Sequence, residues 1–407
     1  MPIGQEETIM ASFDGTSKSS EGKGQSIKYW EITTPFMQDI RRQVLSKASP
    51  EAIQYLDPEH YAGPTVVCDA SLQTNEEWLR ERQNSIGSSE VSNIFGESPY
   101  PHCTNLDLFY KKRGVAPLIE DDAEDAERRE RNFLYGHLME EYLHLVTRQM
   151  FPGARLIIDT NTYAAPKMPF VTANLDAMMQ LSDGSFVHVE YKTAGVFGEE
   201  AYANGAIPPH YKRQLIQCQH IMGVYVSYLI VAFSRDNIIV RRYVRDLDEE
   251  MEQVIATEEF WTKNVLAGIE PQPLGPVSNV VDTVKRFSGY ADKKLPAISL
   301  EQSLWDTVKD FKQINDEIKN VNAQLKILQK RKDEMTVPLA MAMGQNTKAY
   351  IDDGQTAYEI SFTPRAGARK CDFDRLALNR PDIYAEYVTQ KEEGSRPMSI
   401  KEVAVRN

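Results

Sequence analysis

The fold of this chain is decided by residues 173–193, which read ANLDAMMQLSDGSFVHVEYKT. Two apolar runs flank Asp183-Gly184, and an Asp-Gly pair in that setting predicts a β-hairpin. Side chains alternate between the two faces of a strand, so Glu190 and Lys192 lie on the same face of the second strand. The hairpin then brings Asp176 beside Glu190.

Two carboxylates and an ammonium group on one sheet face suit a hard divalent cation and an activated water molecule. The alternative is a solvated strand face with a surface salt bridge, because Glu-x-Lys is a common sequence. The rest of the chain decides between these interpretations.

Further motifs lie around this hairpin in a consistent order. They are Trp78-Leu79-Arg80-Glu81-Arg82, Ile86-Gly87-Ser88-Ser89-Glu90, Ser98-Pro99-Tyr100, Gly136-His137-Leu138-Met139-Glu140 and Gln217-Cys218-Gln219-His220. Over roughly residues 75–235, the ordered set resembles the phage-lambda-type alkaline exonucleases, the YqaJ viral recombinase family. This family lies within the restriction-endonuclease-like Asp…Glu-x-Lys nuclease superfamily. The chain has Leu175 where the family usually has proline, and the following aspartate is retained.

The resemblance implies an α/β (α+β) fold with a restriction-endonuclease-like core, in which helices flank a central mixed β-sheet. It implies a Mg²⁺-dependent 5′→3′ exonuclease acting on double-stranded DNA ends in phage-type recombination. The expected partners are a single-strand annealing protein and further copies of the chain in a homotrimer. An endonuclease of the same fold and a non-catalytic DNA-end-binding scaffold are the alternatives.

By the same resemblance, Asp176 and Glu190 are ligands of Mg²⁺ or Mn²⁺, and the main-chain carbonyl of Tyr191 adds a third oxygen. Lys192 holds or helps to deprotonate the attacking water. Glu140 completes the acidic cluster, although a helix-surface glutamate explains it equally well. His188, the Tyr191 side chain and His220 are expected in packing or at the rim of the site.

The resemblance also places Gln219 beside the catalytic lysine, with Gln217 and Gln214 as competing assignments. Glutamines two residues apart cannot share a helix face, so only one of Gln217 and Gln219 can point at the metal. Arg82 and Ser89 are expected to bind the 5′-phosphate of a DNA end, since a guanidinium forks onto phosphate oxygens. A serine at this position is also explained by helix capping alone.

The bulk composition is that of a globular protein. The 407 residues are 42% hydrophobic and carry a net charge of −13, which argues against nucleic-acid binding over the whole surface. We find no apolar run long enough to span a bilayer and no signal-peptide pattern. The four cysteines are scattered, which indicates free thiols in a reducing cytoplasm. The resemblance implies that this is the cytoplasm of a bacterial host of a phage or prophage.

We expect five segments along the chain. Residues 1–27 form a polar disordered tail, 28–75 an N-terminal extension, 76–270 the exonuclease core, 271–298 a linker, and 299–407 a helical and β-hairpin extension. In the extension, a heptad seam predicts a helix that packs on its own domain or contacts a partner chain. Its members are Phe311, Ile314, Ile318, Val321, Leu325 and Leu328. A hairpin with its turn at Asp353-Gly354 follows.

Overall fold

The Asp183-Gly184 turn folds the chain as expected in the computed structural model, which describes residues 28–120, 123–363 and 371–388. Gly184 takes a φ of +90°, a backbone conformation that glycine adopts without steric cost. The turn joins β6 (Ala177–Gln180) to β7 (Phe186–Thr193) as antiparallel neighbours, with Ala177 opposite Val189. The predicted hairpin is therefore confirmed.

The hairpin is part of a five-stranded mixed sheet with the order β3-β6-β7-β8-β9. The outer strands are β3 (Arg155–Ile157) and β9 (Ile238–Val244), and β8 (Val226–Ala232) pairs with β7 in parallel. Parallel strands need a crossover connection, which here contains α7 (Pro209–Met222). A second sheet has the order β1-β4-β5-β2. Its strands are β1 (Thr65–Asp69), β4 (Asn161–Ala165), β5 (Met168–Asn174) and β2 (Ile86–Gly87).

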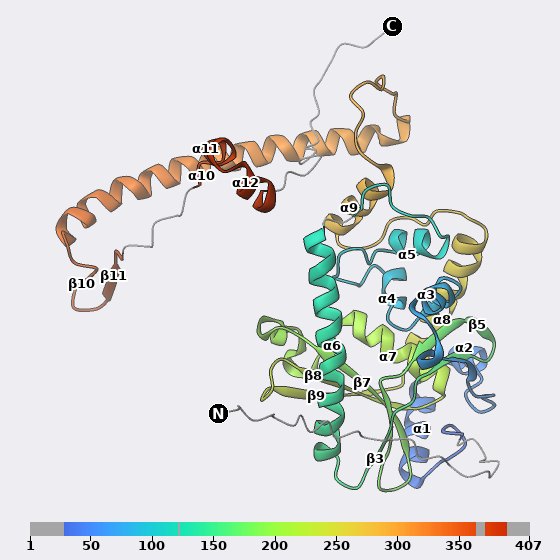
Figure 1. The fold of residues 1–407 in the computed structure, drawn as a ribbon. Coiled ribbons are helices and arrows are strands. Elements are labelled where there is room, and N and C mark those ends of the chain that lie inside the picture. Colours follow the sequence, from blue (N-terminus) through green and yellow to red (C-terminus); the bar gives the residue numbers. More distant parts are fainter. Residues whose placement is uncertain (1–27, 121–122, 364–370, 389–407) are drawn as a thin grey trace, which may run out of the picture. The chain divides into compact units, whose positions relative to one another are not determined.

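Helix α7 lies between the two sheets and buries both of its long faces. Leu215 packs with Leu229 of β8, whereas Ile221 packs with Val171 and Ala173 of β5. The long helix α6 (Ala123–Met150) packs against β7, with Leu143 in the same core cluster as Val189 (Figure 1). The mixed sheets flanked by helices confirm the predicted fold class.

The remaining helices of the first unit surround these layers. They are α1 (Pro35–Lys47), α2 (Pro50–Leu56), η1 (Ala70–Leu72), α3 (Asn75–Gln83), α4 (Val91–Ile94), α5 (Asn105–Lys112), η2 (Val196–Gly205), α8 (Leu247–Glu259), η3 (Phe260–Leu266) and α9 (Val277–Ser288). In the expected N-terminal extension, α1 buries Met37, Ile40 and Val44 in the core of the central sheet. Strand β1 pairs with β4, so this segment is built into the fold of the first unit.

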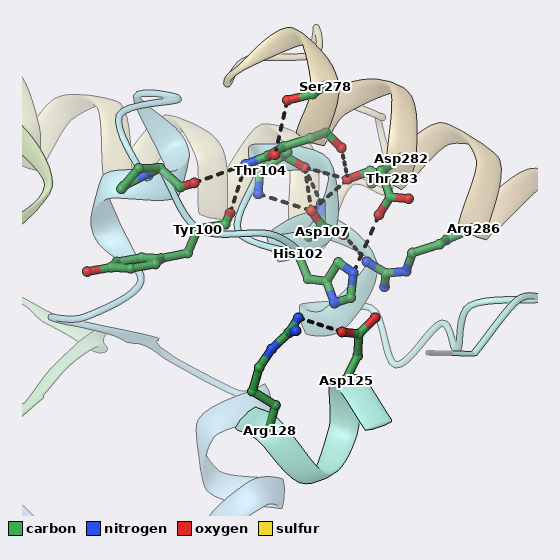
Figure 2. Close-up of polar contacts among 12 residues, drawn as sticks. Tyr100, His102, Thr104, Asp107, Asp125, Arg128, Ser278, Asp282, Thr283 and Arg286 are labelled. Atoms are coloured by element: carbon green, nitrogen blue, oxygen red, sulfur yellow. Dashed lines mark hydrogen bonds and ion pairs between the residues drawn. The ribbon is translucent and has the colours of Figure 1, made fainter. Parts of the chain in front are cut away.

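Residues 271–298, expected as a linker, contain α9, which is fastened to α5. The buried carboxylate of Asp107 accepts hydrogen bonds from Thr104 and Thr283 and pairs with Arg286 at 3.2 Å (Figure 2). Because a buried carboxylate must be paired, this network holds α9 in place. The first compact unit accordingly runs from Met1 to Tyr290.

The second unit runs from Ala291 to Asn407 and is dominated by one helix. Its elements are η4 (Gln302–Leu304), α10 (Trp305–Met343), β10 (Lys348–Asp352), β11 (Ala357–Ser361), α11 (Phe373–Asn379) and α12 (Pro381–Tyr387). The predicted C-terminal helix and hairpin are both confirmed, and β10 pairs with β11 around Asp353-Gly354. Among the described residues, no helix has the length and apolar character needed to cross a membrane.

Candidate active site

Asp176 lies where β5 ends and β6 begins, directly beside β7. The main-chain N–H of Tyr191 donates to Asp176 Oδ2 over 2.7 Å. In a strand, the N–H and C=O of one residue point to the same side, so the Tyr191 carbonyl also faces the Asp176 side of β7. The Asp176 carboxylate and the Tyr191 carbonyl, both predicted from the sequence to be metal ligands, therefore lie on the same side of β7.

Glu190 is 1% exposed and projects from the same strand. Its Oε1 accepts hydrogen bonds from Lys192 Nζ and from Gln214 Nε2, each over 2.6 Å. Its Oε2 has no hydrogen-bond partner among the described residues, and His188 Nε2 lies 3.5 Å away. A buried carboxylate oxygen without a partner is costly, and a bound cation would satisfy it.

The charges of the site are strongly coupled. Burial and the neighbouring Glu190 raise the pKa of Asp176. Burial opposes ionisation of Glu190, but Lys192 and His188 outweigh it and lower the pKa of Glu190 to about 2. Burial also opposes the charge of Lys192, yet Glu190 and Asp176 raise its pKa overall. Two close carboxylates that repel one another are a favourable setting for a divalent cation.

Glu140 reaches this region from α6. It lines the same cavity of about 620 Å³ as Asp176 and Lys192, and it contributes to the raised pKa of Asp176. His137, one turn earlier in the helix, lies 3.6 Å from its carboxylate. The structure thus places Glu140 toward the acidic cluster.

The glutamine expected beside the lysine is in a different position. Gln214 contacts Glu190, whereas Gln219 Nε2 donates to the Tyr243 carbonyl over 3.4 Å. Gln217 donates to the carbonyls of Ile86 and Thr172 and so ties β2 to β5. Five residues advance a helix by about 140° beyond one turn, so Gln214 and Gln219 leave α7 on different faces. The expected placement of Gln219 is corrected in favour of Gln214.

Arg82 and Ser89 are brought together as expected. Arg82 Nη2 donates to Ser89 Oγ over 3.3 Å, and Ser89 lines the cavity that contains Asp176. Neither Ser88 nor Ser89 caps α4, because the residue at the capping position is Glu90 and its side chain forms no capping hydrogen bond. Helix capping therefore does not account for Ser89.

Glu90 organises the cations around this pair. It is 6% exposed and contacts Arg82 at 3.1 Å, Lys111 at 2.6 Å and Lys112 at 2.7 Å. Burial opposes ionisation of Glu90, but Lys112, Arg82 and Lys111 lower its pKa to about 2. Burial lowers the pKa of Lys112 to about 8, against the pull of Glu90. One carboxylate thus holds three cationic side chains in place, and of these Arg82 also contacts Ser89.

Two tyrosines line the cavity, and neither was given a role from the sequence. Tyr100 and Tyr211 share a hydrogen bond of 2.7 Å, and Lys192 Nζ lies 5.4 Å from the centre of the Tyr211 ring. Next to them, burial and Lys192 lower the pKa of His210 to about 4. For Tyr100 the available signal was the motif Ser98-Pro99-Tyr100, and for Tyr211 it was the position next to His210 at the start of α7.

Glu190 also belongs to a second group of metal-type ligands. One ring nitrogen of His188, Cys218 Sγ and a Glu190 carboxylate oxygen lie within 4.8 Å of one another, and all three residues are buried. Burial and nearby Glu190 raise the pKa of Cys218, which keeps it a thiol and hence a weak ligand. Oxygen ligands on the Asp176 side fit a hard cation better.

The part of the chain that contains these residues is similar to known proteins. Residues 77–225 match the model of the YqaJ-like viral recombinase domain. A protein of Bacillus subtilis (strain 168), called "Uncharacterized protein YqaJ", is 25% identical over 347 residues, which are 83% of this chain and 98% of that protein.

Two solved structures are also similar. An alkaline exonuclease (LHK-Exo) from Laribacter hongkongensis is 18% identical, with a TM-score of 0.38, over 48% of this chain and 95% of that chain. LHK-Exo in complex with dAMP is 17% identical, with the same TM-score and coverage.

Residues 77–225 are thus similar to the YqaJ-like viral recombinase domain, in agreement with the resemblance drawn from the sequence.

Proposed function

We propose that this protein is a Mg²⁺-dependent exonuclease that degrades double-stranded DNA from its 5′ ends during phage-type recombination. One observation carries the proposal: Asp176, Tyr191, Lys192 and Ser89 line one cavity, where the Tyr191 N–H donates to Asp176 and Lys192 donates to Glu190. The YqaJ-like domain supports the recombination setting.

Asp176, Glu190 and the Tyr191 carbonyl are the proposed ligands of Mg²⁺, with Mn²⁺ as a substitute. Magnesium takes one or two carboxylates and keeps several waters, so this small oxygen set is sufficient. The unpartnered Glu190 Oε2 supports the fit. When bound, the cation supplies Lewis-acid activation of water and of the phosphodiester.

The other residues of the site orient the proposed metal ligands and stabilise charge on the substrate. Gln214 and Lys192 both donate to Glu190 Oε1 and so fix that carboxylate. Lys192 stays protonated in the resting site, because its two acidic neighbours raise its pKa. We propose that it holds the attacking water and stabilises charge on the phosphate. Glu140 would complete the acidic cluster from α6.

Arg82 and Ser89 are the proposed binding site for a 5′-phosphate. The cluster of Arg82, Lys111 and Lys112 exceeds the charge of Glu90, which favours an anion beside it. The Arg82 ion pair with Glu90 holds the guanidinium near Ser89 before substrate arrives. An anchored 5′ end would make cleavage depend on ends. A homotrimer and a single-strand annealing partner remain further predictions.

The decisive experiment digests a linear duplex carrying a label at its 5′ ends, beside a closed circle of the same sequence. The expected result is release of labelled mononucleotide from the linear DNA with Mg²⁺, none with chelator, and an intact circle. Cutting of the circle would instead identify an endonuclease. Equal rates for the parent and for Glu190→Ala would identify a contaminating activity and leave a non-catalytic end-binding scaffold.

A further inference from the structure

The helix α10 presents an apolar seam that the described residues of its own unit leave exposed. The heptad positions continue beyond Leu328 to Met335 and Leu339, with Lys332 as one interruption. The apolar seam residues from Ile314 to Leu339 are between 46% and 67% exposed. Seven large apolar side chains are therefore presented on one helix, in the a and d positions typical of a coiled coil.

Such a helix requires a partner. The 39 residues of α10 extend for about 58 Å at 1.5 Å per residue. Most helical stability in proteins comes from packing of an apolar face, and large exposed apolar patches mark interaction sites. The expectation that the seam packs within its own unit is not met, since Val321 is 61% exposed.

The charges beside the seam indicate which partner fits. With Phe311 at position a, the four e positions Asn315, Asn322, Gln329 and Thr336 are uncharged. In a parallel pair g faces e, so no interhelical charge pair can form. In an antiparallel pair, g positions face g positions. Glu317 of each copy then faces Arg331 of the other copy, which gives two ion pairs between the helices. Arg331 has no ion pair among the described residues, and Glu317 accepts only from Gln313.

We infer that α10 pairs with α10 of a second copy of this chain as an antiparallel two-stranded coiled coil. The register that joins Glu317 to Arg331 places Leu325 opposite Val321 and Ile318 opposite Leu328. Lys332 then faces Ile314, and a single polar residue at a core position restricts register and strand number. The inference concerns the C-terminal unit and does not depend on the proposed nuclease chemistry.

Cysteine crosslinking of the full-length chain tests this arrangement, whatever the nuclease units do. Cys371 is exposed, so the background carries Cys371→Ser. Val321→Cys and Leu325→Cys chains are prepared separately, one with a size tag, then mixed under reducing conditions and oxidised. The antiparallel pair predicts a disulfide between the two different chains in the mixture, and none above background in either variant alone.

A matched pair of substitutions tests the seam itself. Ile318→Asp places a charge in the interface and should lower the crosslinked fraction about tenfold or more. Ile327→Asp is the control, because Ile327 is 56% exposed on the same helix but lies off the seam, and it should leave crosslinking unchanged.

Two results would overturn the inference. Crosslinking of each single variant with itself would show a parallel arrangement. Absence of crosslinks in the mixture would show that α10 does not self-associate.

Discussion

Gln214 Nε2 lies 2.6 Å from Glu190 Oε1. A side chain of α7, the helix in the connection between the parallel strands β7 and β8, therefore fixes a carboxylate of the candidate metal site. Lys192 donates to the same oxygen. Both donors bind Oε1, which leaves Oε2 without a hydrogen-bond partner among the described residues, with His188 Nε2 3.5 Å away.

Replacing Gln214 by alanine should therefore weaken the site without removing a ligand. We expect activity to fall by roughly 10–100-fold and the Mg²⁺ concentration for half-maximal rate to rise, as for other residues that orient metal ligands. Gln219→Ala is the control on the same helix, since Gln219 contacts the Tyr243 carbonyl. Magnesium titrations of the initial rate measure both. Equal losses in the two variants would contradict the placement of Gln214.

Asp176→Asn should separate activity from stability. Asparagine keeps an oxygen that can accept from the Tyr191 N–H but removes repulsion from Glu190, so the free energy of unfolding should rise by about 1 kcal/mol, or roughly 2–4 °C in Tm. Nuclease activity should be abolished. In the parent, Mg²⁺ should raise Tm by mass action, and this shift should disappear in the variant. Calorimetry with and without Mg²⁺ measures Tm for both proteins. A lower Tm for Asp176→Asn than for the parent without Mg²⁺ would argue against repulsion between Asp176 and Glu190.

Arg82→Ala should change the preference for DNA ends more than the metal requirement. The ratio of rates on 5′-phosphorylated and 5′-hydroxyl duplexes should fall about tenfold, the loss of roughly one charge-assisted hydrogen bond. Arg80→Ala is the control, because Arg80 lies on the same helix and pairs with the exposed Glu76. No preference for phosphorylated ends in the parent would refute the phosphate pocket.

A buried ion pair away from the cavity should govern acid stability. Glu250 is fully buried and accepts from Arg245 Nε and Nη2, each over 2.6 Å. Burial opposes its ionisation, but Arg245 and His220 lower the pKa of Glu250 to about 2. Because this pKa lies below the ordinary 4.5, the stabilisation is complete above about pH 4.5 and is lost as the pH falls toward 2.

Glu250→Gln should accordingly lower the free energy of unfolding by about 3–5 kcal/mol at neutral pH, since it leaves the Arg245 charge buried without its partner. Glu252→Gln is the matched control, because Glu252 is exposed where it meets Arg213 and should change stability by less than about 1 kcal/mol. Denaturant unfolding at pH 7 and pH 3 measures both. The difference between Glu250→Gln and the parent should shrink at pH 3.

Local patterns carried much of the fold. Strand alternation placed Glu190 and Lys192 on one face, and Asp-Gly placed both hairpin turns. These features depend on neighbours within a few residues, whose spacing the chain itself sets. The roles of the site residues remain predictions.

Spacing alone was insufficient where helices meet sheets. Three glutamines of α7 were candidates, and only the rotation of α7 between the two sheets brings Gln214 to Glu190. The expected linker turned out to contain α9, because its anchor is Asp107, more than 160 residues earlier in the chain.

By itself, the sequence determined the hairpin, the shared strand face of Glu190 and Lys192, the resemblance to the YqaJ family and the heptad seam, since each follows from short-range periodicity or an ordered motif. Only the tertiary structure decided which glutamine meets the carboxylate, how Glu90 gathers three cations, and that the α10 seam stays exposed. Those outcomes depend on packing between segments distant in the chain, which local spacing does not encode.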